Sequence, residues 1–263
     1  MKKLIYFLVS SLILISCSTN DDFLDTNSSE PEKSDSSTMR YGDTKWVPLG
    51  SSIPVGWVAI AANNSIGIQI MDLNGSPSGA EQWVLSYSIL PYGWVGINTN
   101  GAGKVLIKNI LGHASGIQVW VLIGARPPAD WIYTTTVNGN FRLIKNISAF
   151  PTGSLEWILA ASDVPSGWVT VDSSGSNVQI LKINGYQAGA TVYVLIGSRL
   201  PTGWVAIDTN LANTRRLVKN LNGLPSGTYV WILPTPTSTP LPQGWVLNNT
   251  TTYPRPGLNI RKI

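Results

Sequence analysis

The segment EQWVLSYSILPYGWVGI, residues 81–97, decides the fold because similar segments recur along the chain. They read QVWVLIGARPPADWIYT (118–134), LEWILAASDVPSGWVTV (155–171) and TVYVLIGSRLPTGWVAI (191–207), at intervals of 37, 37 and 36 residues. Each contains an aromatic residue inside an apolar stretch and a tryptophan eleven positions later, directly after a turn. Two aromatic series with one common period indicate a repeat protein.

Both series extend beyond these segments. The turn series follows the turns and comprises Trp57, Trp94, Trp131, Trp168, Trp204 and Trp245. The strand series lies inside the apolar stretches and comprises Trp46, Trp83, Trp120, Trp157, Tyr193 and Trp231.

Each repeat is predicted to hold three short strands. A turn such as Pro91-Tyr92-Gly93 opens the unit, and proline at position i+1 with glycine at i+3 suits a type I turn. Strands such as 94–97, 105–108 and 119–123 follow, rich in β-branched and aromatic residues and separated by turn residues. No stretch shows a sustained helical period. The sequence therefore predicts an all-β domain of meander repeats.

The two ends of the domain, residues 44–263, complement each other. Residues 46–49 supply only the third strand of a unit, and residues 244–263 supply only the first two. We therefore expect a closed, propeller-like ring of six units of about 37 residues, the last completed by both termini. Propeller blades normally have four strands, so a fourth could lie within 74–80. The alternative is a β-prism or a closed barrel of paired repeats.

Residues 1–16 are predicted to form a lipoprotein signal peptide. Two lysines precede an apolar run, residues 4–15, which is shorter than the roughly 20 residues of a membrane-spanning helix. The run ends in LISC, residues 14–17, a motif that resembles the lipobox of bacterial lipoproteins. The resemblance implies cleavage before Cys17, the only cysteine of the chain, and acylation of that residue. The alternative is an ordinary secretory signal with an accidental cysteine.

Residues 17–43 are predicted to form a disordered acidic tether behind the acylated cysteine. After Cys17 this segment has few apolar residues and carries seven acidic against two basic side chains. Asp21-Asp22 resemble the acidic tags that send some lipoproteins to the cell surface. We expect an outer-membrane lipoprotein that faces outward and is held in the membrane by its lipid.

The turn series provides the candidate ligand-binding residues. Aromatic faces stack on the apolar faces of sugar rings, and a turn-adjacent indole can reach the rim of the domain. We therefore assign ligand contact to Trp57, Trp94, Trp131, Trp168, Trp204 and Trp245, with inter-unit packing as the alternative. For the strand series we expect packing, since its neighbours are Val, Leu and Ile.

A basic position also repeats, at Lys108, Lys145, Lys182 and Lys219. Like charges repeated on one face would attract an acidic polysaccharide or another polyanion. The alternative, which we favour, is that the alkyl stems pack while the ammonium groups reach solvent. Nucleic acid is not expected as a partner, because no nucleic-acid-binding motif is present.

The inventory of reactive residues argues against an enzyme. One histidine and one cysteine cannot supply a His/Cys metal cluster, so no metal and no cofactor are expected. The few carboxylates scatter over five units, whereas a glycosidase needs two beside one bond.

The sequence therefore favours a surface-anchored, non-catalytic, lectin-like module that binds a glycan. Its repeated aromatics weakly resemble those of lectin-type β-propellers. The alternatives are a protein-interaction or adhesion scaffold of an outer-membrane complex, and a degenerate propeller hydrolase.

Overall fold

The computed structural model describes residues 40–263 except 138, 211, 235–240 and 252–256. The described part contains eighteen strands and no helix, which confirms the all-β prediction. The strands are β1 (Thr44–Val47), β2 (Trp57–Asn63), β3 (Gly67–Asp72), β4 (Glu81–Leu85), β5 (Trp94–Thr99), β6 (Lys104–Asn109), β7 (Gln118–Leu122), β8 (Trp131–Val137), β9 (Phe141–Asn146), β10 (Leu155–Leu159), β11 (Trp168–Ser174), β12 (Asn177–Lys182), β13 (Thr191–Leu195), β14 (Trp204–Thr209), β15 (Arg215–Asn220), β16 (Tyr229–Ile232), β17 (Trp245–Thr251) and β18 (Gly257–Lys262).

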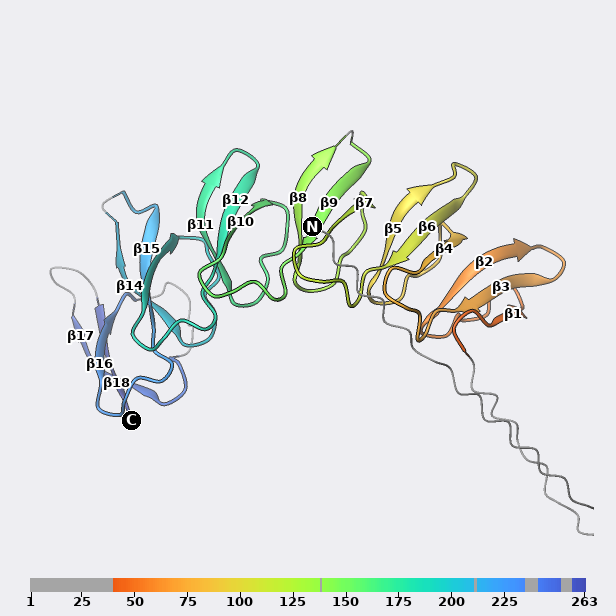
Figure 1. Ribbon diagram of the computed structural model, residues 1–263. Coiled ribbons are helices and arrows are strands. Elements are labelled where there is room, and N and C mark those ends of the chain that lie inside the picture. The colour runs from red at the N-terminus through yellow and green to blue at the C-terminus, as the bar shows by residue number, and fades with distance from the viewer. Residues whose placement is uncertain (1–39, 138, 211, 235–240, 252–256) are drawn as a thin grey trace, which may run out of the picture. The chain divides into compact units, whose positions relative to one another are not determined.

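These strands form six antiparallel three-stranded sheets that follow one another along the chain (Figure 1). Sheet 1 comprises β1–β3, sheet 2 comprises β4–β6, and so on to sheet 6 with β16–β18. Within every sheet the third strand in the chain lies in the middle, as in the order β1-β3-β2. The six three-stranded units are therefore confirmed, with a strand grouping that differs from the expected one.

The expectation that both termini complete one unit is wrong. Strand β1 pairs with β3 and β16 pairs with β18, so the first and last sheets are each complete. Each first strand joins the hairpin that follows it because the residues just before that strand already form backbone hydrogen bonds with this hairpin. Gly79 N–H donates to the Asn109 carbonyl, and Asn109 N–H donates to Ala80. Gly42 and Asp43 pair with Asp72 in the same way, although the tether was expected to extend to residue 43.

Five apolar clusters fill the junctions between successive sheets. Between sheets 2 and 3, for example, Val95 and Ile110 pack against Val121, Trp131 and Ile144. The strands likewise contact the next sheet in chain order, through β2 and β4, β5 and β7, β8 and β10, β11 and β13, and β14 and β16. In the described part no cluster joins sheet 6 to sheet 1 and no barrel closes, so the expected closure of a ring is not seen there. Each sheet is held by its neighbours along the chain.

The turn before each turn-series tryptophan differs from the expected type. Trp57 N–H donates to the Pro54 carbonyl, and the same bond recurs in all six sheets. Proline therefore occupies position i, and Gly56 at position i+2 has a φ of 85°. A positive φ at i+2 is characteristic of a type II turn, which explains the recurrent glycine.

Candidate functional site

The turn-series tryptophans are buried. Their exposed fractions lie between 3% and 7%, so the expectation that these indoles reach the rim is wrong. Trp94, for example, packs in the junction between sheets 1 and 2 with Val58 and Leu73 of the preceding unit. The tryptophans concerned are Trp57, Trp94, Trp131, Trp168, Trp204 and Trp245.

The strand series, which was expected to pack, is exposed. The exposed fractions of these side chains lie between 37% and 49%. Each lies on the first strand of its sheet, which is an edge strand in the order β1-β3-β2. We call this set the aromatic row: Trp46, Trp83, Trp120, Trp157, Tyr193 and Trp231.

Strand alternation explains why the aromatic row faces solvent. Successive side chains of a strand point to opposite faces of the sheet. Along β4, Val84 is buried in the junction with sheet 1, whereas Glu81 and Trp83 are exposed. The same alternation of exposure holds for Gln118 and Trp120 in β7. A polar residue two positions before the aromatic was therefore a sequence signal for exposure in these strands.

The basic position is shared by only three of the four predicted lysines. Lys108, Lys145 and Lys219 each lie opposite the second residue of the neighbouring hairpin strand. Lys182 instead lies opposite Trp168, so the prediction that it is equivalent to the other three is wrong. The β11–β12 hairpin is one residue shorter than its predecessors, which shifts the register and places Leu181 at the equivalent position.

Two of these lysines are held in ion pairs. Lys108 Nζ lies 2.9 Å from Glu81 Oε1, and Lys145 Nζ lies 2.7 Å from Glu156 Oε1. Lys182 Nζ donates to the Phe150 carbonyl at 2.7 Å. These contacts account for three of the four lysines without a ligand and weaken the case for a polyanion site.

Grooves lie between the loops that connect the first and second strands of successive sheets, which we call the crossing loops. The 1/2 groove, between the crossing loops of sheets 1 and 2, has a volume of about 610 Å³ and no charged lining residue. Its tips are highly exposed, with Val55 at 97% and Ile89 at 88%.

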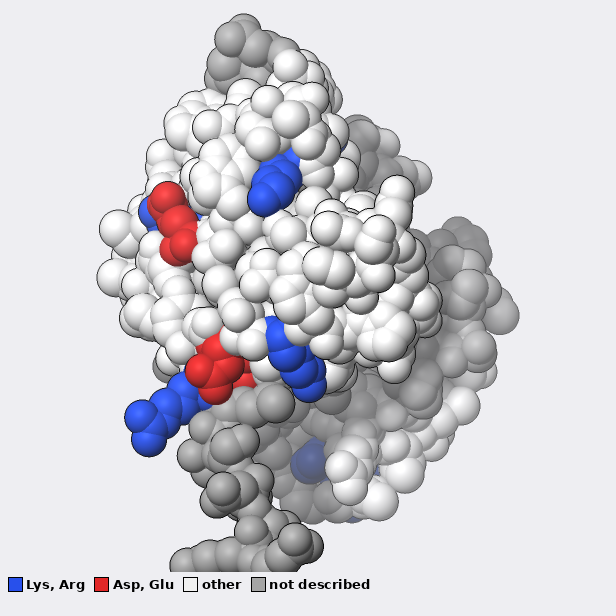
Figure 2. All heavy atoms as spheres, turned by 90° about the vertical axis from the view of Figure 1, so that its right-hand side faces the viewer, with Lys and Arg blue, Asp and Glu red and all other residues white. Residues whose placement is uncertain are grey.

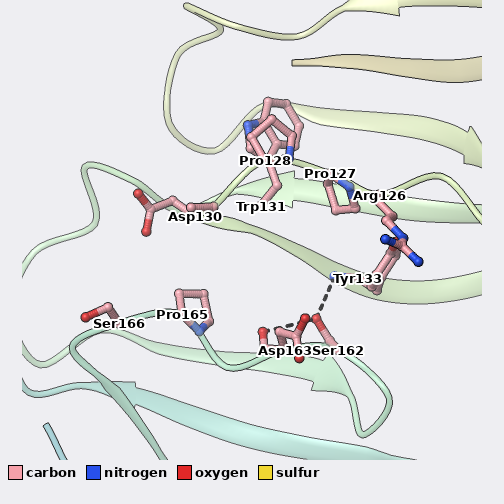
Figure 3. A pocket seen from close by; sticks show the side chains of 11 residues that line it. Arg126, Pro127, Pro128, Asp130, Trp131, Tyr133, Ser162, Asp163, Pro165 and Ser166 are labelled. Carbon is pink, nitrogen blue, oxygen red and sulfur yellow. Dashed lines mark hydrogen bonds between the residues drawn. The ribbon is translucent and has the colours of Figure 1, made fainter. Parts of the chain in front are cut away.

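The 3/4 groove lies between the crossing loops of sheets 3 and 4 and has a volume of about 780 Å³. It is lined by charged residues, prolines, serines and two aromatic side chains (Figure 3). The charged lining residues are Arg126, Asp130 and Asp163.

Tyr133 is fixed at the wall of the 3/4 groove. Its hydroxyl donates to the Ala125 carbonyl, and its backbone N–H donates to Ser162 Oγ at 3.2 Å. The Arg142 guanidinium lies over the ring, 5.1 Å from its centroid. Burial raises the pKa of Tyr133 above its ordinary value.

The single histidine is engaged in packing. His113 Nδ1 lies 2.7 Å from Ser78 Oγ, and the ring centroid lies 6.2 Å from that of Trp131. Burial and the positive charge of Lys108 lower the pKa of His113. Within the described ranges, no three His, Cys, Asp or Glu side chains are arranged to hold a metal ion.

Several predicted features fall on residues that the structure does not describe. The signal peptide, Cys17 and the tether up to residue 39 lie outside the described residues. In the part that is described, no helix is long and apolar enough to cross a membrane.

No protein-family model, curated protein or solved structure matches the chain.

Proposed function

We propose that the protein is a non-catalytic, surface-anchored glycan-binding module whose ligand lies along the aromatic row. The observation that carries this proposal is the repeated placement of a half-exposed aromatic on the edge strand of all six sheets. The turn series already supplies each junction with a buried tryptophan. The aromatic row thus adds large exposed apolar surface that the cores do not use.

The arrangement suits a repeating polymer. Packed sheets lie about 10 Å apart, so equivalent aromatics on successive sheets are close enough for one extended chain to contact more than one. Each contact can be weak, because simultaneous contacts raise the overall affinity by roughly 10²–10⁴. Glu81 and Gln118 lie two positions before Trp83 and Trp120 on the same strand face and can bond sugar hydroxyls.

Affinity electrophoresis through gels that contain starch, mannan, xylan or pectin tests this function. We expect at least one polysaccharide to retard the protein, and Trp120→Ala to reduce the retardation. Tyr92→Ala is the matched control, because Tyr92 is an exposed aromatic of the 1/2 groove, outside the row. Unchanged retardation in Trp120→Ala, Trp157→Ala and their double variant would refute the row as the binding surface.

The lipid anchor is part of the same proposal and rests on the lipobox-like residues 14–17. We expect Cys17→Ser to abolish incorporation of labelled palmitate and to release the protein from the membrane fraction. A variant that remains in that fraction without label would contradict the anchor.

A second candidate function is a protein-interaction scaffold, and the 1/2 groove favours it. Val55, Tyr87, Ile89 and Tyr92 line this groove and are 60% to 97% exposed. Seen from the side on which β1–β3 lie, the surface is largely uncharged (Figure 2). Substitution of Ile89 by Ser would disrupt such an interface and leave polysaccharide binding unchanged.

A further inference from the structure

The third unit departs from the others at the turn that borders the 3/4 groove. Five units have glycine before the turn-series tryptophan, but here Asp130 takes the position with a φ of 66°. Left-handed backbone is strained for a residue with a Cβ atom, and such strain clusters at binding and catalytic sites. The third unit therefore retains a costly residue at the edge of a groove.

The structure makes room for this residue. A Cβ added at Gly93 would lie 2.1 Å from Leu111, and one added at Gly56 would lie 2.2 Å from Asn74. In the third unit the residue that corresponds to Leu111 is Ser148, whose small side chain removes this clash. Asp130 and Ser148 thus form a matched pair that departs from the repeat pattern.

A second departure lies next to Tyr133, one of the residues that line the same groove. Arg142 lies on the central strand of sheet 3. Among the other five sheets, the equivalent residue of the central strand is apolar in four and arginine in sheet 5. The guanidinium of Arg142 covers the Tyr133 ring, and the buried Nε of Arg142 has no hydrogen-bond partner. The residues at this position in the other sheets are Ile68, Val105, Val178, Arg216 and Leu258.

The groove combines polar groups with apolar walls. Figure 3 shows Arg126 of one crossing loop beside Tyr133 of β8, and Asp163 on the facing crossing loop. Pro128 and Pro165 lie between these residues and Asp130. Ser162 Oγ already accepts the Tyr133 N–H. The groups available to a ligand are thus one guanidinium, two carboxylates and proline rings, within the size range of small-molecule sites.

We propose that the 3/4 groove is a binding site for a neutral saccharide residue. Carboxylates accept hydrogen bonds from sugar hydroxyls, the guanidinium donates to ring or amide oxygens, and the proline rings contact the apolar face of the sugar. The two carboxylates at the groove repel an acidic sugar. This inference rests on the proposed glycan binding and adds a site that selects one sugar unit.

Saturation-transfer NMR on residues 40–263, which contain all six sheets and five cores, tests the site. The probes are glucose, galactose, N-acetylglucosamine and galacturonate. We expect transfer to at least one neutral sugar and not to galacturonate. Asp163→Asn and Arg126→Gln should each weaken that binding at least tenfold. Asp130→Gly, which restores the repeat pattern, should weaken binding and raise the melting temperature.

Tyr92→Ala is the matched control, because Tyr92 lies in the uncharged 1/2 groove, and this variant should bind the monosaccharide normally. Absence of transfer to every neutral sugar, or binding unaffected by both Asp163→Asn and Arg126→Gln, would overturn the proposal. Monosaccharide binding without retardation by any polysaccharide would support the groove and refute the aromatic row.

Discussion

The two aromatic series have the same period and nearly the same composition, but they lie in opposite environments. The turn series is buried, five of its six members in the junctions between sheets, whereas the strand series is exposed on the edge strands. The difference arises from strand alternation and from the type II turn, which together direct the turn-series indole into the junction. One series therefore stabilises the array, and the other is available to a ligand.

The largest expected effect is on the free energy of unfolding, which substitutions in the turn series should lower far more than substitutions in the strand series. Trp131→Ala removes a side chain that is 93% buried and packs against Val95 and Ile110 of the preceding sheet. We expect a loss of about 3–5 kcal/mol in the free energy of unfolding. Trp120→Ala should cost about 1 kcal/mol or less, because its side chain is half-exposed. Chemical denaturation of both variants measures this difference, and equal losses would remove the distinction between the series.

A smaller effect concerns the turn that directs Trp131 into the core. Ser148→Leu should destabilise the protein by about 1–3 kcal/mol, because the leucine meets the Cβ of Asp130. The loss should largely disappear in the double variant Asp130→Gly/Ser148→Leu, which restores the pair found in sheet 2. A double-mutant cycle by denaturation measures the coupling. Strict additivity would show that the two residues do not constrain each other.

The next smaller effect concerns polysaccharide binding, to which only the strand series should contribute directly. Trp120→Ala should weaken polysaccharide binding about tenfold, which corresponds to about 1.4 kcal/mol. Adding Trp157→Ala should weaken it further, because a multivalent ligand loses two contacts. Quantitative affinity electrophoresis provides the dissociation constants. A loss in Tyr92→Ala as large as in Trp120→Ala would point instead to the crossing loops.

The smallest effect concerns the histidine that packs beside Trp131. Its pKa is lower in the folded than in the unfolded chain, so the folded protein binds fewer protons at this residue. Stability is therefore fully present above the ordinary histidine pKa of about 6.5 and decreases as the pH falls through it. Melting temperatures between pH 7.5 and 5 should show this decrease, and His113→Asn should reduce it. An identical pH profile in that variant would contradict the assignment.

Much of the fold was predictable from the sequence because the period is visible in the chain itself. The nearly constant spacing of the six members of each aromatic series defines six units, and the short β-branched stretches define their strands. The assignment of strands to sheets was not predictable, because a strand that lies between two hairpins can pair with the preceding or the following one. The bonds of Gly79 and Ala80 to Asn109 decide it, and these are long-range contacts.

The candidate site was harder to predict, since exposure depends on which face the next sheet covers. Apolar neighbours suggested that Trp83 packs, yet Glu81 on the same face carried the opposite signal. Lys182 has the sequence spacing of the other lysines, but the β11–β12 hairpin is one residue shorter, so Lys182 occupies a different position in the strand register. The 3/4 groove needs two loops from successive units, and the sequence alone does not bring them together.

Oxidative footprinting of the tryptophans, read by mass spectrometry with and without a polysaccharide that retards the protein, tests the central claim most directly. We predict rapid oxidation of Trp46, Trp83, Trp120, Trp157 and Trp231 in the free protein, protection of several of them by the ligand, and slow oxidation of the turn series in both states. Protection confined to the turn series, or oxidation of the row that the ligand leaves unchanged, would contradict the account.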